Sequence, residues 1–165
     1  AVMINEKVYA ALRDNSGKIG TFGHGYTYSG HPVSAAVALE TLKIYEERDI
    51  VKQVRSVVPT FEKSIRKFAD HPLVGEVRQV GLVGAVELVK NKATKEPFDM
   101  TKLVGLTVAK FCQEEGLITR AVGDSVAFSP PLIITAAQIE EMFRRFGRAL
   151  EKAEVWIRDQ GLLAA

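Results

Sequence analysis

The chain has 165 residues, of which 47% are hydrophobic and 25% are charged, and its 22 basic and 20 acidic side chains leave a net charge of +2. This composition is typical of a globular protein, and the length suffices for one hydrophobic core and a second small one but not for two full-sized domains. Both signs of charge are interspersed and no uncharged apolar run reaches about 18 residues, so neither nucleic acid nor a membrane is an expected partner.

The first four residues, Ala1-Val2-Met3-Ile4, form an apolar run that predicts a buried strand. A buried strand needs neighbours on both sides, so we expect the chain to be part of a longer polypeptide whose earlier part is missing. No basic region with an apolar signal core is present at the N-terminus, and we expect a cytoplasmic protein.

A glycine-rich segment, FGHGYTYSGHP at residues 22–32, concentrates the chemistry of the first part of the chain. Its three glycines let the backbone approach a ligand closely, and its hydroxyl groups are hydrogen-bond donors. The segment leads directly into a predicted helix N-terminus, where unpaired amides and the helix dipole favour an anion. These features fit a phosphate group, and the alternative is a glycine-rich turn that binds no ligand.

Two helices are predicted before the first strands. One begins near Pro32, a residue suited to the first helical position, and runs toward Arg48. The other has an apolar stripe over residues 54–68. Pro59 interrupts this stripe and predicts a kink, or a break into two shorter helices.

Short strands and helices alternate in the rest of the chain. Apolar stretches at 76–80 and 83–89 predict two strands, and the apolar spacing after residue 104 predicts a helix that ends at Gly116. Residues 117–122 and 125–128 predict a hairpin closed by a tight turn at Gly123-Asp124.

The last helix is the one with the clearest signals. Thr135 and Gln138 form a capping box directly before an apolar stripe that runs from Ile139 to Leu150. From about residue 50 onward we therefore expect an α+β domain, with helices on one face of a three- or four-stranded antiparallel sheet.

Few other residues suggest a site. His24, His31 and His71 are too scattered for a metal centre, and we expect no metal. Cys112 is the only cysteine, which excludes an internal disulfide, and its position on the apolar side of a helix predicts a core residue.

Two separated motifs resemble the class III (omega) aminotransferases, which use pyridoxal phosphate. The first is GHGYTYSGHPV at residues 23–33, preceded by the apolar run at the N-terminus. The second runs from Gly116 to Thr135 and includes Arg120, the hairpin turn and the double proline Pro130-Pro131. The resemblance extends over nearly the whole chain, and two motifs in the correct order are more specific than either alone.

The resemblance implies the end of the large domain of a fold-type I pyridoxal-phosphate enzyme, followed by a small C-terminal domain. We accordingly assign residues 1–48 to the remnant of the large cofactor domain with its interdomain helix, and residues 49–165 to the small α+β domain. In this family the threonine at the position of Thr27 contacts the cofactor phosphate held by the other subunit, which implies a homodimer with composite sites. Tyr26 and Tyr28 either line the cofactor pocket or serve only in packing.

Arg120 occupies the position of the arginine that binds a substrate carboxylate in related ω-transaminases. A guanidinium fork suits this bidentate task. The alternative is a surface arginine paired with Asp124 across the hairpin turn.

The resemblance also implies an absence. In the family, the lysine that forms the Schiff base lies shortly before the strand that corresponds to Ala1–Ile4, and the acidic partner of the pyridine nitrogen lies further upstream. Lys7 and Lys18 follow that strand and do not match this lysine. We therefore expect no catalytic residue in this chain and no activity from it alone.

The sequence is compatible with three interpretations of its function. The first is the C-terminal part of an aminotransferase that moves an amino group between an amine or ω-amino acid and a keto acid such as pyruvate. The second is an aminomutase or decarboxylase of the same fold. The third is a freestanding α+β binding module whose glycine-rich loop is only a turn.

Overall fold

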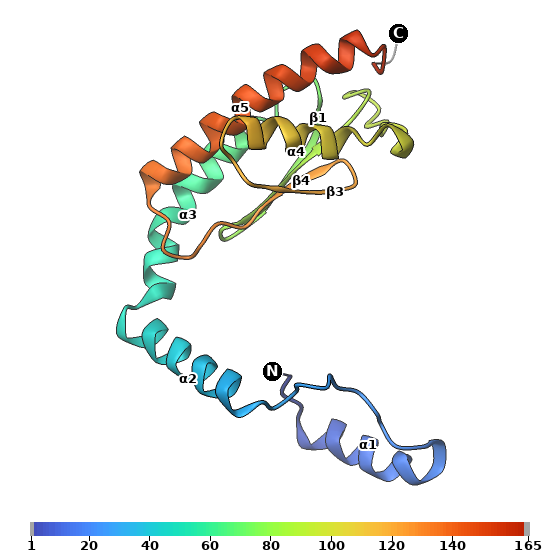
Figure 1. The fold of residues 1–165 in the computed structure, drawn as a ribbon, viewed down its shortest axis with the longest axis vertical. Helices are drawn as coiled ribbons and strands as arrows, with labels where there is room; N and C mark the ends of the chain where they lie inside the picture. Colours follow the sequence, from blue (N-terminus) through green and yellow to red (C-terminus); the bar gives the residue numbers. More distant parts are fainter. Residues whose placement is uncertain (1, 164–165) are drawn as a thin grey trace. The chain divides into compact units, whose positions relative to one another are not determined.

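The computed structural model describes residues 2–163, and its contacts divide the chain into two compact units, Ala1–Ile44 and Tyr45–Ala165. The first unit contains α1 (Glu6–Ile19) and most of α2 (Pro32–Glu47) (Figure 1). The division falls within α2, whereas the sequence placed the domain boundary after residue 48. The assignment of the first part to a larger cofactor domain stays a prediction.

The predicted strand at the N-terminus is absent from the described residues. Residues 2–4 are not paired with any strand and are exposed, and Ala1 lies outside the described residues. A strand forms only against a partner backbone, and no segment of residues 2–44 supplies one. A strand at residues 2–4 is therefore not formed among the described residues, and the expectation that it forms and is buried in a longer polypeptide stays a prediction.

The sequence analysis also missed α1. Its start has a local signal, because the Asn5 side chain accepts a hydrogen bond from the N–H of Val8 at 3.0 Å and Glu6 lies in the first turn. No side chain of α1 or α2 is buried in the described structure. Apolar residues of α2 such as Val37, Leu39 and Leu42 are more than half exposed.

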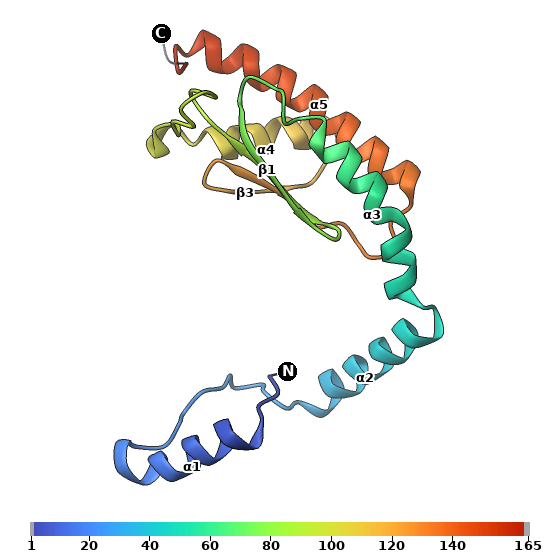
Figure 2. The same ribbon diagram turned by 180° about the vertical axis from the view of Figure 1, so that it is seen from behind.

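α3 (Ile50–Arg66) is one continuous helix with Pro59 inside it, so of the two alternatives predicted at Pro59 the break is wrong and the kink stays a prediction. Proline has no N–H to donate to the preceding turn, which often ends a helix. Here the apolar stripe of α3 packs against α5 (Ala136–Asp159), and Phe61 and Ile65 of that stripe are fully buried. Figures 1 and 2 show the two helices side by side from opposite directions. We attribute the continuity of α3 to this packing.

Four strands form one antiparallel sheet in the order β1-β2-β4-β3, which confirms the predicted three- or four-stranded sheet. The strands are β1 (Val74–Val80), β2 (Val83–Leu88), β3 (Arg120–Val122) and β4 (Ser125–Phe128). The β3–β4 hairpin turns at Gly123-Asp124, as predicted. β3 is an edge strand of three residues and, within residues 2–163, pairs with β4 alone.

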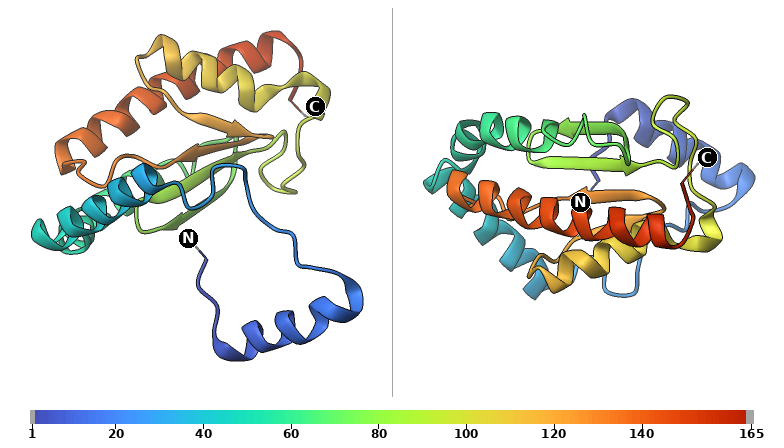
Figure 3. Two further views of the ribbon diagram at one scale, coloured as in Figure 1. Left: turned by 60° about the horizontal axis from the view of Figure 1, so that its bottom comes forward. Right: turned by 90° about the horizontal axis from the view of Figure 1, so that it is seen from above.

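Three helices cover one face of this sheet and leave the other face open. α3, α4 (Val104–Glu114) and α5 lie on one side of the sheet (Figure 3). Along β2 and β4 the buried residues alternate with more exposed ones, which is the pattern of a sheet with one covered face. The largest fully buried side chains are Phe61, Phe146, Ile65, Leu73, Leu88, Ile139, Leu150 and Ile157.

Local sequence signals of the second unit are confirmed in detail. Thr135 and Gln138 form the predicted capping box at the start of α5. Cys112 is fully buried in the core, and burial raises the pKa of its thiol to about 12.

Between residues 2 and 163, no helix is long and apolar enough to cross a bilayer.

Candidate functional site

The glycine-rich segment forms a small turn directly before α2. The N–H of Ser29 donates to the carbonyl of Tyr26 at 2.9 Å, and the N–H of Tyr26 donates to Ser29 Oγ at 2.9 Å. Gly30 has a φ of +72°, a left-handed conformation that favours glycine, and brings the chain to Pro32 at the start of α2. The turn is therefore ordered by its own hydrogen bonds.

Thr27 lies at the tip of this turn with its donors available. Among the described residues, neither its N–H nor its hydroxyl makes a hydrogen bond, and the side chain is exposed. Residues 15–39 contain no acidic side chain. A hydroxyl and an amide beside a helix N-terminus, without a nearby carboxylate on the same segment, fit a phosphate group.

Tyr26 precedes Thr27 in the turn, but its backbone N–H is not available as a hydrogen-bond donor to a ligand. Its N–H is already donated to Ser29, and its side chain is 82% exposed. The ring centre lies 6.3 Å from that of His24. A cofactor contact from Tyr26 would therefore come from its ring or its hydroxyl, and this role stays a prediction.

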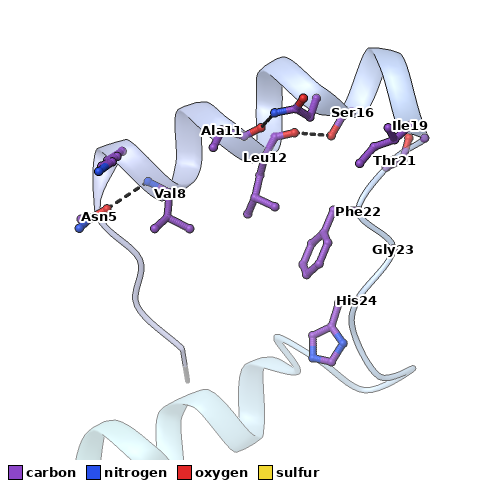
Figure 4. A pocket seen from close by; sticks show the side chains of 13 residues that line it. Asn5, Val8, Ala11, Leu12, Ser16, Ile19, Thr21, Phe22, Gly23 and His24 are labelled. Atoms are coloured by element: carbon purple, nitrogen blue, oxygen red, sulfur yellow. Dashed lines mark hydrogen bonds between the residues drawn. The ribbon is translucent and has the colours of Figure 1, made fainter.

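A separate apolar hollow of about 960 Å³ lies between α1 and the segment that follows it (Figure 4). Val8 and Leu12 line it from α1, and Phe22 and His24 line it from the returning segment. Thr27 and Tyr26 do not line this hollow, so the predicted phosphate contacts lie elsewhere on the unit.

Arg120 lies on the open face of the sheet in the second unit. Its strand partner is Ala127, which alternates with the buried residues Val126 and Phe128. Since paired residues of an antiparallel sheet share a face, Arg120 points away from the helices. The same row continues through Ala85 of β2 to Arg78 of β1, so two alanine side chains separate Arg120 from Arg78 across the sheet.

The alternative role for Arg120, an ion pair with Asp124, is not observed. Asp124 Oδ1 accepts a hydrogen bond from the N–H of Gly105 at 3.0 Å, and the Arg120 side chain has no hydrogen bond or ion pair with any described residue. The pKa of Asp124 is raised above its ordinary value. Burial is the main cause and the charge of Glu87 adds to it, while the hydrogen bond from Gly105 acts in the opposite direction.

A second arginine on the open face was missed by the sequence analysis. Arg78 of β1 donates to Glu87 and, at 3.1 Å, to Glu76, and its other terminal nitrogen lies 3.2 Å from Ser125 Oγ. This arginine is neutralised by its neighbours, whereas Arg120 is not. The contrast depends on register between strands, which local sequence does not reveal.

The other candidate residues are separate from these two sites. His24 and His31 are exposed on the glycine-rich segment, and within residues 2–163 no three His, Cys, Asp or Glu side chains form a metal-binding group. Lys7 and Lys18 are exposed on α1.

Residues 1–150 match the model of the aminotransferase class-III family. The chain belongs to the class-III aminotransferase family. It is 42% identical to gamma aminobutyrate transaminase 3, chloroplastic, of Solanum lycopersicum, over 93% of this chain and 30% of that protein. Vanillin aminotransferase of Capsicum chinense is 40% identical over 93% of this chain and 34% of that protein.

Solved transaminase structures have the same fold. A transaminase described with L-alanine matches with a TM-score of 0.79 and 47% identity, covering 93% of this chain and 36% of that one. The omega transaminase of Pseudomonas jessenii in complex with PMP matches with a TM-score of 0.80 and 44% identity, covering 93% and 34%. The chain thus spans about a third of the length of its relatives. It has the fold of the corresponding part of fold-type I transaminases, and class-III aminotransferases are pyridoxal-phosphate-dependent.

Proposed function

We propose that this chain is the C-terminal part of a pyridoxal-phosphate-dependent aminotransferase, which transfers an amino group between an amine or ω-amino acid and a keto acid such as pyruvate. The observation that carries the proposal is the exposed guanidinium of Arg120 on the open face of the sheet, which has no partner among the described residues and lies at the position matched by the family motif. A cytoplasmic homodimer is part of the same proposal, although plant relatives carry chloroplastic and mitochondrial names.

Arg120 binds the carboxylate of the amino acid or keto acid in this proposal. A bidentate guanidinium contact to a carboxylate is directional and contributes about 1.5–3 kcal/mol. The neighbouring residues Ala127 and Ala85 leave space beside it, so the side chain is able to swing aside when the donor is an amine without a carboxylate.

Thr27 and its amide hold the cofactor phosphate, and in the proposed dimer they act on the site of the opposite subunit. The cofactor, when bound, would supply an electron sink for the electron pair that stays on the amine-bearing carbon of the substrate when that carbon loses its proton. The lysine that this chemistry requires lies outside these 165 residues in the proposal.

The exposed apolar side chains of α2 support the proposal that a larger domain covers this helix, because a helix that is apolar on several sides is normally buried.

The decisive experiment uses the full-length protein that contains this chain, with its cofactor bound. Each half-reaction is measured separately, with L-alanine, pyruvate and a primary amine that lacks a carboxylate. In Arg120→Ala and Arg120→Lys, we expect the KM for the two acids to rise about 10- to 100-fold while the amine half-reaction changes little.

Arg144→Ala is the matched control, because Arg144 is an exposed arginine of α5 that pairs with Glu141. It should leave both half-reactions unchanged. Equal losses for acids and amines in the Arg120 variants would show that Arg120 is structural. Release of carbon dioxide, or migration of the amino group within one molecule, would instead favour a decarboxylase or an aminomutase.

A further inference from the structure

At its turn, the hairpin that bears Arg120 is attached to the rest of its unit by two hydrogen bonds of Asp124. Asp124 Oδ1 accepts the N–H of Gly105 at 3.0 Å, and the backbone carbonyl of Asp124 accepts the N–H of Leu88 at 3.0 Å. Gly105 lies in the first turn of α4, and Leu88 is the last residue of β2. Asp124 therefore connects the hairpin turn to a helix and to a central strand at once.

The contact at Gly105 is close as well as polar. A Cβ atom added to Gly105 would lie 2.2 Å from the carbonyl oxygen of Gly123 and 2.9 Å from the Cα of Asp124. The turn thus rests directly on the backbone of α4, and its position relative to the helix has little freedom. Gly123 itself has a φ of +57°, as a tight turn of this kind requires.

Arg120 lies on a short strand. β3 pairs with β4 through three residues, packs against α4 and, among the described residues, has no strand on its outer edge. At the other end of the hairpin, Thr119 Oγ1 donates to the carbonyl of Ala127 at 2.5 Å, which is a contact within the hairpin. A short edge strand of this kind depends on its attachment points, and the turn contacts of Asp124 supply one.

We propose that Asp124 is a positioning residue for Arg120: by holding the β3–β4 turn on the start of α4, it sets the place from which the Arg120 guanidinium meets a substrate carboxylate. This inference rests on the proposed function, because it assigns to Asp124 a role in the acid half-reaction. The role requires an acceptor oxygen rather than a charge. Asn at position 124 retains the acceptor, Ala removes it, and Glu displaces the turn by one methylene.

The test uses the full-length holoenzyme and the same separate half-reactions. In Asp124→Ala we expect the KM for L-alanine and pyruvate to rise about 5- to 30-fold, with a smaller effect on kcat and little effect on the amine half-reaction. Asp124→Asn should stay within about two-fold of the unchanged enzyme, since it preserves the hydrogen bond from Gly105. The double variant Asp124→Ala with Arg120→Ala should bind acids no more weakly than Arg120→Ala alone, because both changes act on the same contact, that between the Arg120 guanidinium and the substrate carboxylate.

Asp99→Ala is the matched control. Asp99 also accepts a backbone N–H at a helix start, that of Thr101 at 2.9 Å, but it lies at the short helix η1 (Met100–Lys102) and not on the hairpin. We expect it to leave the ratio of acid to amine activity unchanged. Hydrogen exchange is the second measurement: residues 117–128 should exchange faster in Asp124→Ala, but not in Asp124→Asn or Arg120→Ala.

The outcomes separate the two proposals. If the holoenzyme transaminates but Asp124→Ala behaves like Asp99→Ala, or if the Asp124 and Arg120 effects add fully, the positioning role is wrong and the proposed function stands. If the unchanged holoenzyme transaminates none of the donors, the proposed function fails, and the substrate role of Asp124 fails with it.

Discussion

His71 Nε2 lies 3.4 Å from Oε2 of Glu154, so the turn before β1 is joined to the last helix of the second unit. The other ring nitrogen, Nδ1, accepts the N–H of Leu73 at 3.2 Å. A nitrogen that accepts a hydrogen bond carries no proton, so this arrangement requires the neutral imidazole with its proton on Nε2. As long as Nδ1 accepts the N–H of Leu73, the imidazole is neutral, and Nε2 contacts Glu154 as a hydrogen-bond donor rather than as half of an ion pair.

We predict that the free energy of unfolding decreases as the pH falls below about 6.5. Burial lowers the pKa of His71, the charge of Glu154 raises it, Lys92 lowers it and Glu151 raises it, and the net direction is downward. The folded state then binds fewer protons than the unfolded state, so the stability that His71 contributes is present above its ordinary pKa and is lost as the pH falls through the lowered one.

Denaturant unfolding at several pH values tests this prediction. His71→Gln should remove the slope below about pH 6.5, and Glu154→Gln should extend the slope to lower pH, because the charge that raises the pKa of His71 in the folded state is gone. An unchanged slope in His71→Gln would assign the effect to other groups.

Gly105→Ala should destabilise the second unit by about 1–3 kcal/mol. The new methyl group would meet backbone atoms of Gly123 and Asp124, which cannot move aside as a flexible side chain does. The matched control is Gly17→Ala in α1, where an added Cβ meets nothing within 4 Å. Glycine is unfavourable inside a helix, so this change should stabilise α1 by up to about 1 kcal/mol.

Local hydrogen exchange distinguishes the two glycine variants, since each affects its own unit. Gly105→Ala should raise exchange around the start of α4 and in the β3–β4 turn, whereas Gly17→Ala should slow it in α1. Equal stability of Gly105→Ala and the unchanged protein would show that the turn does not rest on α4.

Thr27→Ala in the full-length protein should weaken cofactor retention about 10- to 100-fold, because a hydrogen bond to a charged phosphate contributes about 1.5–3 kcal/mol. Thr27→Ser keeps the hydroxyl and should retain most of the affinity. The measurement is the cofactor absorbance that remains after dialysis, together with the mass of the assembly by light scattering. A loss of dimer in parallel with the cofactor would point to a structural role for Thr27 instead.

Local interactions explain which parts of this structure the sequence determined. The capping box of Thr135 and Gln138, the apolar stripes of α3 and α5, and the Gly123-Asp124 turn all depend on residues within one or two turns of each other. They were predicted correctly for that reason. The two family motifs are likewise contiguous stretches of sequence, and they led to the family that the comparisons show.

Tertiary packing decided the rest. Whether Pro59 breaks a helix depends on what that helix packs against, and whether residues 2–4 form a strand depends on a partner backbone that the described chain does not provide. The partner of Asp124 is Gly105, 19 residues earlier, and not the nearby Arg120. Strand register places Arg78 beside two glutamates, whereas the Arg120 side chain has no ion pair with any residue that the structure describes. These outcomes depend on contacts between residues distant in sequence, so only the folded chain determines them.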